Sequence, residues 1–369
     1  MPRVCILTTV HDPFDVRVFH KEARSLAHAG YDVCLLAPAE KAERVDGVDI
    51  VPIGGDKKGR LHRTTVLWWR ALRKAVAAQA DVYHFHDPEL IPLGLLLKVF
   101  TRARVVYDIH EDYPQQILSK AWIPTGFHRP VAAGMALLER LAAGVFDGLA
   151  AATPDIASRF PPSKTMTVHN FPRLEELAIS GGDVLPYAER PNRVVYLGGI
   201  STIRGAFEMV KAVELTKFPV ELMVAGKFES EKLKNELSAF PGWKRTRFLG
   251  WLNRSEVREV LGQSRLGLVL LHPLLRHKRS LPNKLFEYMA AGIPFVASDF
   301  PLWRELGEGA GLFVDPLDPQ AIAEAIDWLL AHPDEAEAMG RRGRELVSKK
   351  YNWDLEAHKL LQLYERLLS

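Results

Sequence analysis

Short apolar runs alternate with stretches of helical periodicity along the whole chain. The first run, RVCILTTV at residues 3–10, is nearly continuous, as expected of a strand buried on both faces of a sheet. A helical stretch that ends at Gly30 follows, with Asp15 placed to cap its first turn. Further strands are expected at residues 31–38, 48–53, 82–86, 104–110, 147–153 and 166–170. This alternation predicts a Rossmann-like α/β domain with an open, doubly wound parallel sheet.

The same alternation begins again at residue 193. The residues before it, 173–192, contain proline and a diglycine without a clear period, which is typical of an inter-domain linker. Strands are then expected at residues 193–200, 220–226, 247–251, 266–273, 294–298 and 311–315, and helices near 319–331, 334–349 and at the end of the chain. We therefore expect two α/β domains, residues 1–172 and 193–351, that face each other across a ligand-binding cleft.

Composition agrees with two soluble domains and excludes several classes of protein. The chain has 369 residues, 47% hydrophobic and 25% charged, and a formal net charge of +3; so weak a charge does not predict nucleic-acid binding. The two cysteines, Cys5 and Cys34, fall in expected strands and are interpreted as core residues in a reducing compartment. With neither a signal peptide nor an apolar run of about 18 residues, a cytoplasmic protein is expected.

The stretch RSLPNKLFEYMAAGIPFVAS, residues 279–298, combines a loop, a helix and a buried strand. Pro282 can take the first helical position, and Gly292 can end the helix. The helix begins with Asn283 and Lys284, where free amides, the helix dipole and a cation favour a phosphate group.

One turn later in the same helix stands Glu287, whose carboxylate could accept two hydrogen bonds from a ribose diol. The alternative interpretation is a surface helix in which Lys284 and Glu287 form an ordinary (i, i+3) ion pair.

A glycine turn follows the first strand of the second half, in YLGGISTIRG. Gly198 and Gly199 would let backbone amides approach a ligand closely, and Arg204, expected to start the next helix, could reach a diphosphate. The motif is neither G-x-G-x-x-G nor a Walker loop, so a plain tight turn is the alternative.

Polar clusters follow two expected strands of the first half, HFHDPE and DIHEDYP. Such strand-end loops are where folds of this class bind substrates, so a substrate-binding rim is the preferred interpretation. The alternatives are a metal site, although neither cluster has a recognisable metal-site spacing, and histidines bonded to backbone carbonyls. The residues concerned are His84, His86, Asp87, Glu89, His110, Glu111 and Asp112.

Residues 57–76, KKGRLHRTTVLWWRALRKAV, form a basic amphipathic stretch. Trp68 and Trp69 interleave with arginines and lysines, a pattern that favours an interfacial helix on anionic lipid. A packed helix with a solvated basic face is the alternative, and nucleic-acid binding is disfavoured because no recognisable module is present.

Taken together, these motifs resemble the glycosyltransferases of the GT-B fold, specifically the large retaining family 4 that includes many polysaccharide and lipopolysaccharide enzymes. HDPFDVRVFHKEARSLAHAGYDV, DVYHFHDPEL and VVYDIHEDYP are similar to the acceptor-side domain of that family. YLGGISTIRG, FLGWL and LPNKLFEYMAAGIPFVASDFP are similar to its donor domain. The final YNWDLEAHKLLQLY resembles the helix that crosses back onto the first domain, so residues 352–369 are assigned there.

The resemblance implies a role for each matching residue. Arg204 and Lys284 would bind the diphosphate of a UDP- or GDP-type nucleotide-sugar donor, and Glu287 would hold its ribose. His110 would lie near the reacting sugar. Backbone near Gly250 and Trp251 would contact the base.

On the acceptor side, the resemblance places Asp15 and Arg17 where the first loop meets both substrates. His86, Asp87 and Glu111 are expected to bind a saccharide or lipid-linked acceptor, at the surface of a membrane if residues 57–76 bind lipid. No metal and no cofactor are implied.

Two departures from the family pattern stand out. A glutamate that usually contacts the donor sugar is replaced by Arg279, and the usual Gly-Arg loop is Gly198-Gly199. Two alternative functions therefore stay open: a sugar-nucleotide epimerase of the same fold, and a non-catalytic nucleotide-sugar-binding subunit. A Rossmann oxidoreductase is less favoured, because no dinucleotide fingerprint follows the first strand of either half.

Overall fold

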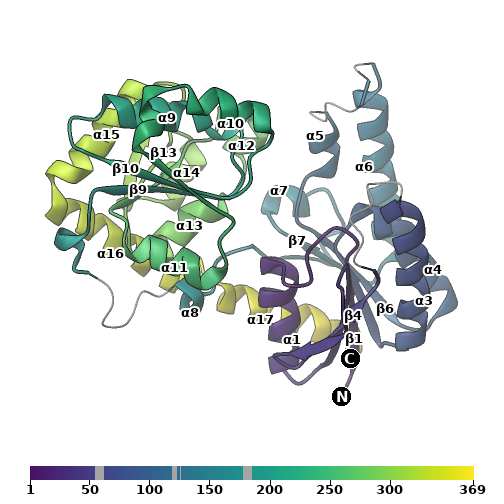
Figure 1. Ribbon diagram of the computed structural model, residues 1–369. Helices are drawn as coiled ribbons and strands as arrows, with labels where there is room; N and C mark the ends of the chain where they lie inside the picture. The colour runs from purple at the N-terminus through teal and green to yellow at the C-terminus, as the bar shows by residue number, and fades with distance from the viewer. Residues whose placement is uncertain (55–61, 119–122, 125, 178–184) are drawn as a thin grey trace. The chain divides into compact units, whose positions relative to one another are not determined.

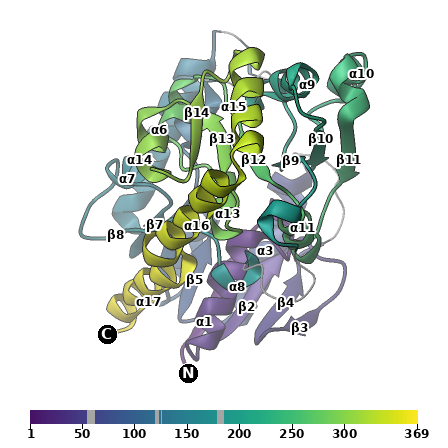
Figure 2. The ribbon, with the colours of Figure 1, turned by 90° about the vertical axis from the view of Figure 1, so that its left-hand side faces the viewer.

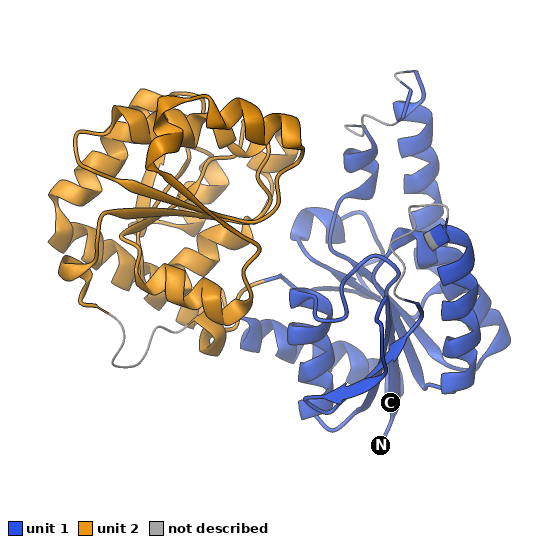
Figure 3. Cartoon of the chain, viewed as in Figure 1, with its two compact units in different colours: residues 1–170, 353–369 blue, residues 171–352 orange. Residues whose placement is uncertain are grey.

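Two α/β units divide the chain between them. In the computed structural model, residues 1–54, 62–118, 123–124, 126–177 and 185–369 are described. Unit 1 consists of Met1–Asn170 and Trp353–Ser369, and unit 2 consists of Phe171–Asn352 (Figure 3).

Unit 1 is built on an eight-stranded sheet in the order β3-β4-β2-β1-β5-β6-β7-β8. The strands are β1 (Arg3–Leu7), β2 (Asp32–Ala37), β3 (Glu43–Val45), β4 (Val48–Pro52), β5 (Val82–Phe85), β6 (Arg104–Ile109), β7 (Gly148–Ala151) and β8 (Thr165–Thr167). The predicted parallel sheet is confirmed, with one addition: β3 pairs antiparallel with β4 at the edge. The sequence ERV of β3 has no apolar run, so the hydrophobic pattern could not reveal it.

Helices cover both faces of this sheet (Figure 1). One face carries α3 (Trp68–Ala78), α4 (Ile91–Phe100) and α6 (His128–Val145). The opposite face carries the π-helix η1 (Val16–Ala23), α1 (Arg24–His28) and α17 (Trp353–Leu368). The shorter helices are η2 (Arg63–Leu67), η3 (Pro88–Leu90), α5 (Tyr113–Ile117) and α7 (Pro154–Ala157).

The last helix, α17, packs within unit 1. Trp353, Leu360 and Tyr364 of α17 are fully buried in the same core cluster as Val18 and Phe19 of η1. The indole N–H of Trp353 also donates a 2.8 Å hydrogen bond to Ser25 of α1.

The first helical stretch differs from the expected α-helix. Asp15 caps it as predicted, accepting hydrogen bonds from the amides of Arg17 and Val18, but the next eight residues form a π-helix and α1 ends at His28. Hydrogen bonds to the fifth residue back widen each turn, so residues five apart share a face. This places Arg17 and Glu22 together in the interior of the unit.

Unit 2 contains an entirely parallel six-stranded sheet in the order β11-β10-β9-β12-β13-β14. The strands are β9 (Arg193–Leu197), β10 (Glu221–Ala225), β11 (Thr246–Gly250), β12 (Leu266–Val269), β13 (Phe295–Ser298) and β14 (Gly311–Val314). Helices pack around this sheet (Figure 2). Apolar clusters lie on both of its faces, which explains why its strands lack polar–apolar alternation.

The helices of unit 2 are α8 (Leu174–Leu177), α9 (Ala206–Leu215), α10 (Glu231–Ser238), α11 (Arg254–Gly262), α12 (Leu275–Lys278), α13 (Asn283–Ala290), α14 (Pro301–Leu306), α15 (Pro319–Ala331) and α16 (Pro333–Lys350). Three 3₁₀ turns, η4 (Tyr187–Glu189), η5 (Thr202–Arg204) and η6 (Pro241–Arg245), complete the unit. Of the expected linker, residues 178–184 lie outside the described residues, whereas α8 and η4 belong to unit 2.

Two local expectations in unit 2 were wrong by a small margin. Pro282 lies one residue before α13 instead of at its first position, with an extended ψ of 115°. Arg204 lies in the turn η5, because Gly205 adopts a left-handed φ of +74° before α9 begins. The expected helix end is present, since Gly292 follows α13 with a φ of +67°.

Other features of the chain bear less on function. Cys5 and Cys34 are buried, unbonded and opposite each other on β1 and β2, as the core interpretation predicts. Among the described residues, no helix combines the length and the apolar character needed to cross a bilayer.

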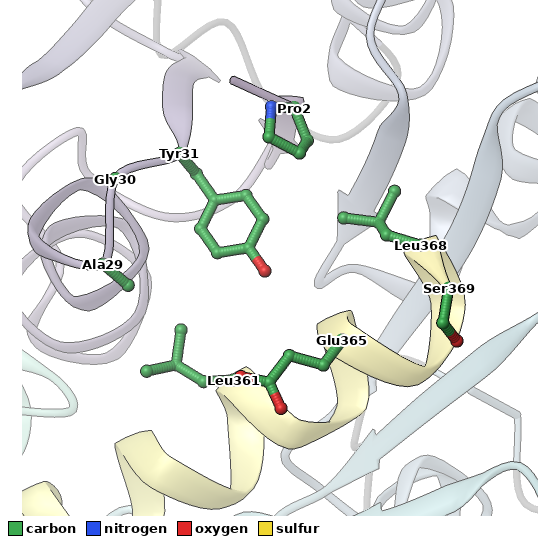
Figure 4. Close-up of a pocket in the computed structure, with 8 residues that line it drawn as sticks. All are labelled: Pro2, Ala29, Gly30, Tyr31, Leu361, Glu365, Leu368 and Ser369. Carbon is green, nitrogen blue, oxygen red and sulfur yellow. The ribbon is translucent and has the colours of Figure 1, made fainter.

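A surface hollow lies between the turn before β2 and α17, and the ring of Tyr31 and the side chain of Leu361 line it (Figure 4). The hollow contains none of the predicted site residues.

Candidate functional site

Two cations meet at the glycine turn that follows β9 in unit 2. Gly198 adopts a φ of +110°, which favours glycine, and its amide donates a 2.8 Å hydrogen bond to Ala225. A Cβ at Gly198 would lie 3.1 Å from Nζ of Lys284, and a Cβ at Gly199 would lie 3.0 Å from Nη1 of Arg204. The sequence-predicted cations therefore converge on the sequence-predicted turn.

Lys284 lies in an apolar and cationic environment. Its Nζ is 4.9 Å from the ring centroid of Tyr196, whose hydroxyl donates a 2.6 Å hydrogen bond to the carbonyl of Gly199. Burial, together with the charge of Arg204, lowers the pKa of Lys284 to about 7, although Glu287 opposes this shift. Two neighbouring cations favour binding of a doubly charged anion such as a diphosphate.

Glu287 does not pair with Lys284, which removes the alternative interpretation of this helix. Its Oε1 instead accepts a 2.8 Å hydrogen bond from Nη1 of Arg254, at the start of α11. Arg254 also donates two 3.2 Å hydrogen bonds to Glu176 of α8. Sequence reasoning missed Arg254 and Glu176, because neither belongs to a local motif and both lie far from Glu287 in the chain.

The remaining predicted donor residues lie on loops and helix starts of the same unit. Gly250 ends β11 with a φ of +72°, and its carbonyl accepts a 2.7 Å hydrogen bond from the amide of Gly226. Trp251 is exposed, and Nζ of Lys227 lies 5.0 Å from its ring centroid. Asn283 is an exposed residue at the first position of α13.

In unit 1, the predicted histidine follows β6 and is held by polar neighbours. Nδ1 of His110 is 3.4 Å from Oδ1 of Asp108, and its Nε2 is 3.4 Å from the hydroxyl of Tyr113. The ring of His11 lies edge-on at a centroid distance of 5.1 Å. The His110 side chain is 15% exposed, so it is both oriented and accessible from outside the unit.

Arg17 holds Asp108 from inside the unit. Its Nε and Nη2 donate hydrogen bonds of 3.2 and 2.6 Å to the two carboxylate oxygens of Asp108, and both terminal nitrogens donate to the carbonyl of Val168. Although burial opposes its ionisation, the charge of Arg17 holds the pKa of Asp108 well below its usual value. Glu22 lies 2.9 Å from Arg17, and burial together with the charge of Asp108 raises its pKa well above its usual value.

Two buried histidines complete this interior cluster. His84 and His86 stack at a centroid distance of 4.9 Å, and Nδ1 of His84 is hydrogen-bonded at 2.8 Å to the hydroxyl of Tyr364. Burial, reinforced by His86, lowers the pKa of His84 to about 3, so the ring is neutral at physiological pH. The interpretation of these histidines as bonded only to backbone carbonyls was wrong for His84, whose described partner is a side chain.

The cluster also has the donor set of a metal site. Possible ligand atoms of Glu22, His84, His86 and Asp108 all lie within 4.8 Å of one another. Arg17, however, already contacts both carboxylates and supplies a positive charge among them. The contacts therefore describe a buried ion-pair network, and the absence of a metal stays a prediction.

The other predicted acceptor residues divide into buried and accessible groups. Asp87 is buried, and its Oδ2 accepts hydrogen bonds from the hydroxyl of Thr8 and the amide of Thr9. Asp15 is partly exposed and pairs with Nδ1 of His11 at 3.3 Å, whereas Glu111 is exposed. Arg17 and His86 are buried, which favours a positioning role for these two; acceptor contact stays a prediction.

Some participating residues of unit 1 were not predicted to be functional. Asp108 and Glu22 were missed, as were His11, Tyr113 and Tyr364, which contact the predicted histidines. A usable signal existed for Asp108, because it is the one charge inside the apolar part of RVVYDIH. An ionised carboxylate in a buried strand requires a cationic partner, and the one that Asp108 has, Arg17, lies 91 residues away.

Of the basic stretch 57–76, residues 57–61 lie outside the described residues. The rest forms η2 and most of α3, in which Ala71 and Ala75 pack on the sheet and Trp69 is 60% exposed.

Comparison with known proteins assigns both units to one enzyme class. The family described as "Glycosyl transferase 4-like domain" matches residues 16–170, and the family described as "Glycosyl transferases group 1" matches residues 183–346. The chain belongs to the GT-B glycosyltransferases. The predicted fold, with its two parallel-sheet α/β domains, is thereby confirmed.

Individual relatives of this glycosyltransferase are distant but cover most of its length. It is 24% identical over 363 residues to the phosphatidyl-myo-inositol mannosyltransferase of Mycobacterium leprae, covering 96% of this chain and 90% of the relative. Among solved structures, the sucrose-phosphate synthase of Thermosynechococcus elongatus aligns with a TM-score of 0.79 at 17% identity, covering 100% and 99% of the two chains. Anabaena HepE in complex with UDP and glucose aligns with a TM-score of 0.75 at 12% identity, covering 99% and 100%.

Proposed function

We propose that this glycosyltransferase moves a sugar from a UDP- or GDP-type nucleotide donor to a saccharide or lipid-linked acceptor, with retention at the anomeric carbon. The observation that carries the proposal is the convergence of Arg204 and Lys284 on the Gly198–Gly199 turn. Among the described residues, neither cation forms an ion pair, so both charges are available to a ligand. The HepE structure, solved with UDP, supports a uridine nucleotide as the first candidate.

Unit 2 would stabilise the leaving group. As the bond between the anomeric carbon and the diphosphate oxygen breaks, negative charge grows on the diphosphate, where Arg204 and Lys284 can neutralise it. Glu287, with one oxygen held by Arg254, would use its other oxygen to accept hydrogen bonds from the ribose. Asn283, Gly250 and Trp251 complete the proposed donor contacts.

Unit 1 would serve the acceptor. An acceptor hydroxyl oxygen forms the new bond to the anomeric carbon, and its proton passes to the departing diphosphate, so retention needs no separate protein base. His110, oriented by Asp108, would bind the reacting sugar. Asp15 and Glu111 are accessible for acceptor hydroxyls, whereas Arg17, His86 and Asp87 would hold that surface in place.

The contact with the donor sugar is expected to differ from the one that the family resemblance implies. Arg279 stands where the resemblance places a carboxylate, directly after α12. A cation there favours a sugar that carries a carboxylate or another acceptor-rich group over one recognised only through donated hydroxyl protons.

The decisive experiment separates transfer from its alternatives. The protein is incubated with UDP- and GDP-sugars, with and without saccharide and lipid-linked acceptors, and the anomeric configuration of any product is read from its proton coupling constant by NMR. An acceptor-dependent product with the configuration of the donor would support the proposal. Epimerisation of the donor without acceptor would favour the epimerase, an inverted product would contradict retention, and donor binding without any turnover would favour a binding subunit.

A further inference from the structure

The three long helices on one face of the unit 1 sheet, α3, α4 and α6, expose no carboxylate, although the short helix α7 on the same face exposes Asp155. This outer helical face consists of α3, α4 and α6, and α4 contacts both of the other helices (Figure 1). Together they contain six lysines and arginines: Arg70, Arg73, Lys74, Lys98, Arg129 and Arg140. Lys98 is paired with Asp147 at 2.8 Å, so the other five carry the excess of positive charge. The single acidic residue of these three helices, Glu139, is buried and bound to Arg159 at 2.6 Å. Ordinary soluble surfaces intersperse both signs of charge, so this face is biased toward an anionic partner.

The outer helical face also exposes large apolar side chains from all three helices. Leu141 on α6 is 63% exposed, and Val99 and Phe100 at the end of α4 are each 74% exposed. The other exposed apolar residues of the face are Trp69, Val76, Val131, Leu137, Leu138 and Val145. Single exposed apolar residues need no explanation, whereas a concentration on adjacent helices marks an interaction surface.

On α6 these residues form a stripe. Val131, Leu138 and Val145 are spaced by seven residues, which places them on one side of the helix, and Leu141 lies between the last two. Arg129 and Arg140 are exposed on the same helix. Exposed apolar residues combined with exposed arginines, and no exposed carboxylate, are typical of a helix that lies in a membrane interface.

The opposite face of the same sheet has an ordinary surface. On α17, exposed Asp354 and Glu365 accompany exposed Leu355 and Arg366. The excess of exposed positive over negative charge is therefore confined, in this comparison, to the outer helical face.

We propose that the outer helical face docks on an anionic membrane surface. Lipid phosphates would pair with its lysines and arginines other than Lys98, and the interface would cover its exposed apolar residues. A second copy of the chain is the less suitable occupant, because a symmetric contact would bring Arg129 and Arg140 of both copies together without a carboxylate to balance them. The inference rests on the proposed function only in that a membrane would present a lipid-linked acceptor; docking itself requires no turnover.

Vesicle co-sedimentation of the full chain tests the proposal. Vesicles of equimolar phosphatidylglycerol and phosphatidylcholine are compared with vesicles of phosphatidylcholine alone. One variant pair removes charge, Arg129→Gln with Arg140→Gln, and another removes apolar area, Leu137→Ser with Leu141→Ser. The matched control, Leu355→Ser with Arg366→Gln, makes equivalent changes on α17. All altered side chains are exposed, so the fold should tolerate each change.

The expected result is binding to the anionic vesicles alone, which fades as salt is added. The charge variant should bind about 5-fold more weakly for each arginine removed, and the apolar variant roughly 10-fold more weakly. The control should bind like the unaltered chain, and none of the variants should alter nucleotide-sugar binding measured by calorimetry. Absence of vesicle binding, equal binding to neutral vesicles, or equal loss in the control would overturn the proposal. A dimer that both test variants abolish, seen by sedimentation without vesicle binding, would assign the face to a second copy instead.

Discussion

Arg254 and Glu287 form a 2.8 Å ion pair that joins the first turn of α11 to α13. The pair fixes one carboxylate oxygen of Glu287. The other terminal nitrogen of the Arg254 guanidinium, Nη2, donates a hydrogen bond to Glu176. A carboxylate oriented in this way is prepared to accept ribose hydroxyl protons without first losing rotational freedom. If Glu287 binds the donor ribose, as proposed above, Arg254 acts as its positioning residue.

Replacement of Arg254 by glutamine should weaken binding of the nucleotide sugar about tenfold, because Glu287 loses a charge-assisted hydrogen bond worth roughly 1.5–3 kcal/mol. Glu287→Gln should have a similar effect, and the double variant should be little worse than either single one, since both act through one contact. Isothermal titration calorimetry measures each affinity. Arg258→Gln changes an exposed arginine on the same helix and should bind normally; additive losses in the double variant would contradict the shared role.

Arg204→Ala or Lys284→Ala should lower kcat of sugar transfer by roughly 10²-fold or more, because each removes a charge that stabilises the departing diphosphate. Initial rates with the donor at saturation separate this loss from weaker binding. Lys232→Ala removes a highly exposed lysine of the same unit and should leave the rate unchanged. Near-normal turnover in both test variants would refute the phosphate assignment.

The parts of this glycosyltransferase that could be predicted from sequence are those encoded locally. The central strands of both sheets are continuous apolar runs, and α13 has its amphipathic period, its following Gly292 and its leading cation within a few residues. Arg204 and Lys284 could be brought together because the carboxyl ends of neighbouring parallel strands share an edge of the sheet.

What could not be predicted depends on contacts between distant segments. The pairing of Arg17 with Asp108 spans 91 residues, and no pattern around either one specifies the other. The π-helical turns that bring Glu22 to the same place have the same apolar spacing in sequence as an α-helix. The edge strand β3 is three residues long and is defined only by its partner β4.

Donor affinity should depend on pH through Lys284. The pKa of about 7 in the free protein means that Lys284 is charged below pH 7 and loses its proton as the pH rises. A bound diphosphate favours the charged form and raises this pKa, so affinity should be constant below pH 7 and fall above it, by at most tenfold per pH unit. An intact nucleotide sugar is the correct probe, because its diphosphate has no group that titrates in this range.

Calorimetry in buffers of different ionisation enthalpy should therefore detect proton uptake on donor binding at pH 7 to 8. Lys284→Arg keeps a charge throughout this range and should give a pH-independent affinity without proton uptake. A pH dependence that persists in Lys284→Arg would assign the titration to another group.

Breaking the buried pair of Arg17 and Asp108 should destabilise unit 1 when either partner is replaced alone. Arg17→Met removes the charge that keeps Asp108 ionised and leaves a buried carboxyl without its main partner, and Asp108→Leu leaves the guanidinium without its main partner. Each change should destabilise unit 1 by about 3–5 kcal/mol. The double variant should lose less than the sum, because no unpaired charge remains once Glu22, whose pKa burial already raises, holds its proton. Urea denaturation of the three variants measures this cycle.

Transfer activity should nevertheless stay low in the double variant, because His110 no longer has the carboxylate that orients it. Full activity in a stable double variant would show that Asp108 serves the fold alone, and additive losses of stability would show that the two side chains do not act as a pair.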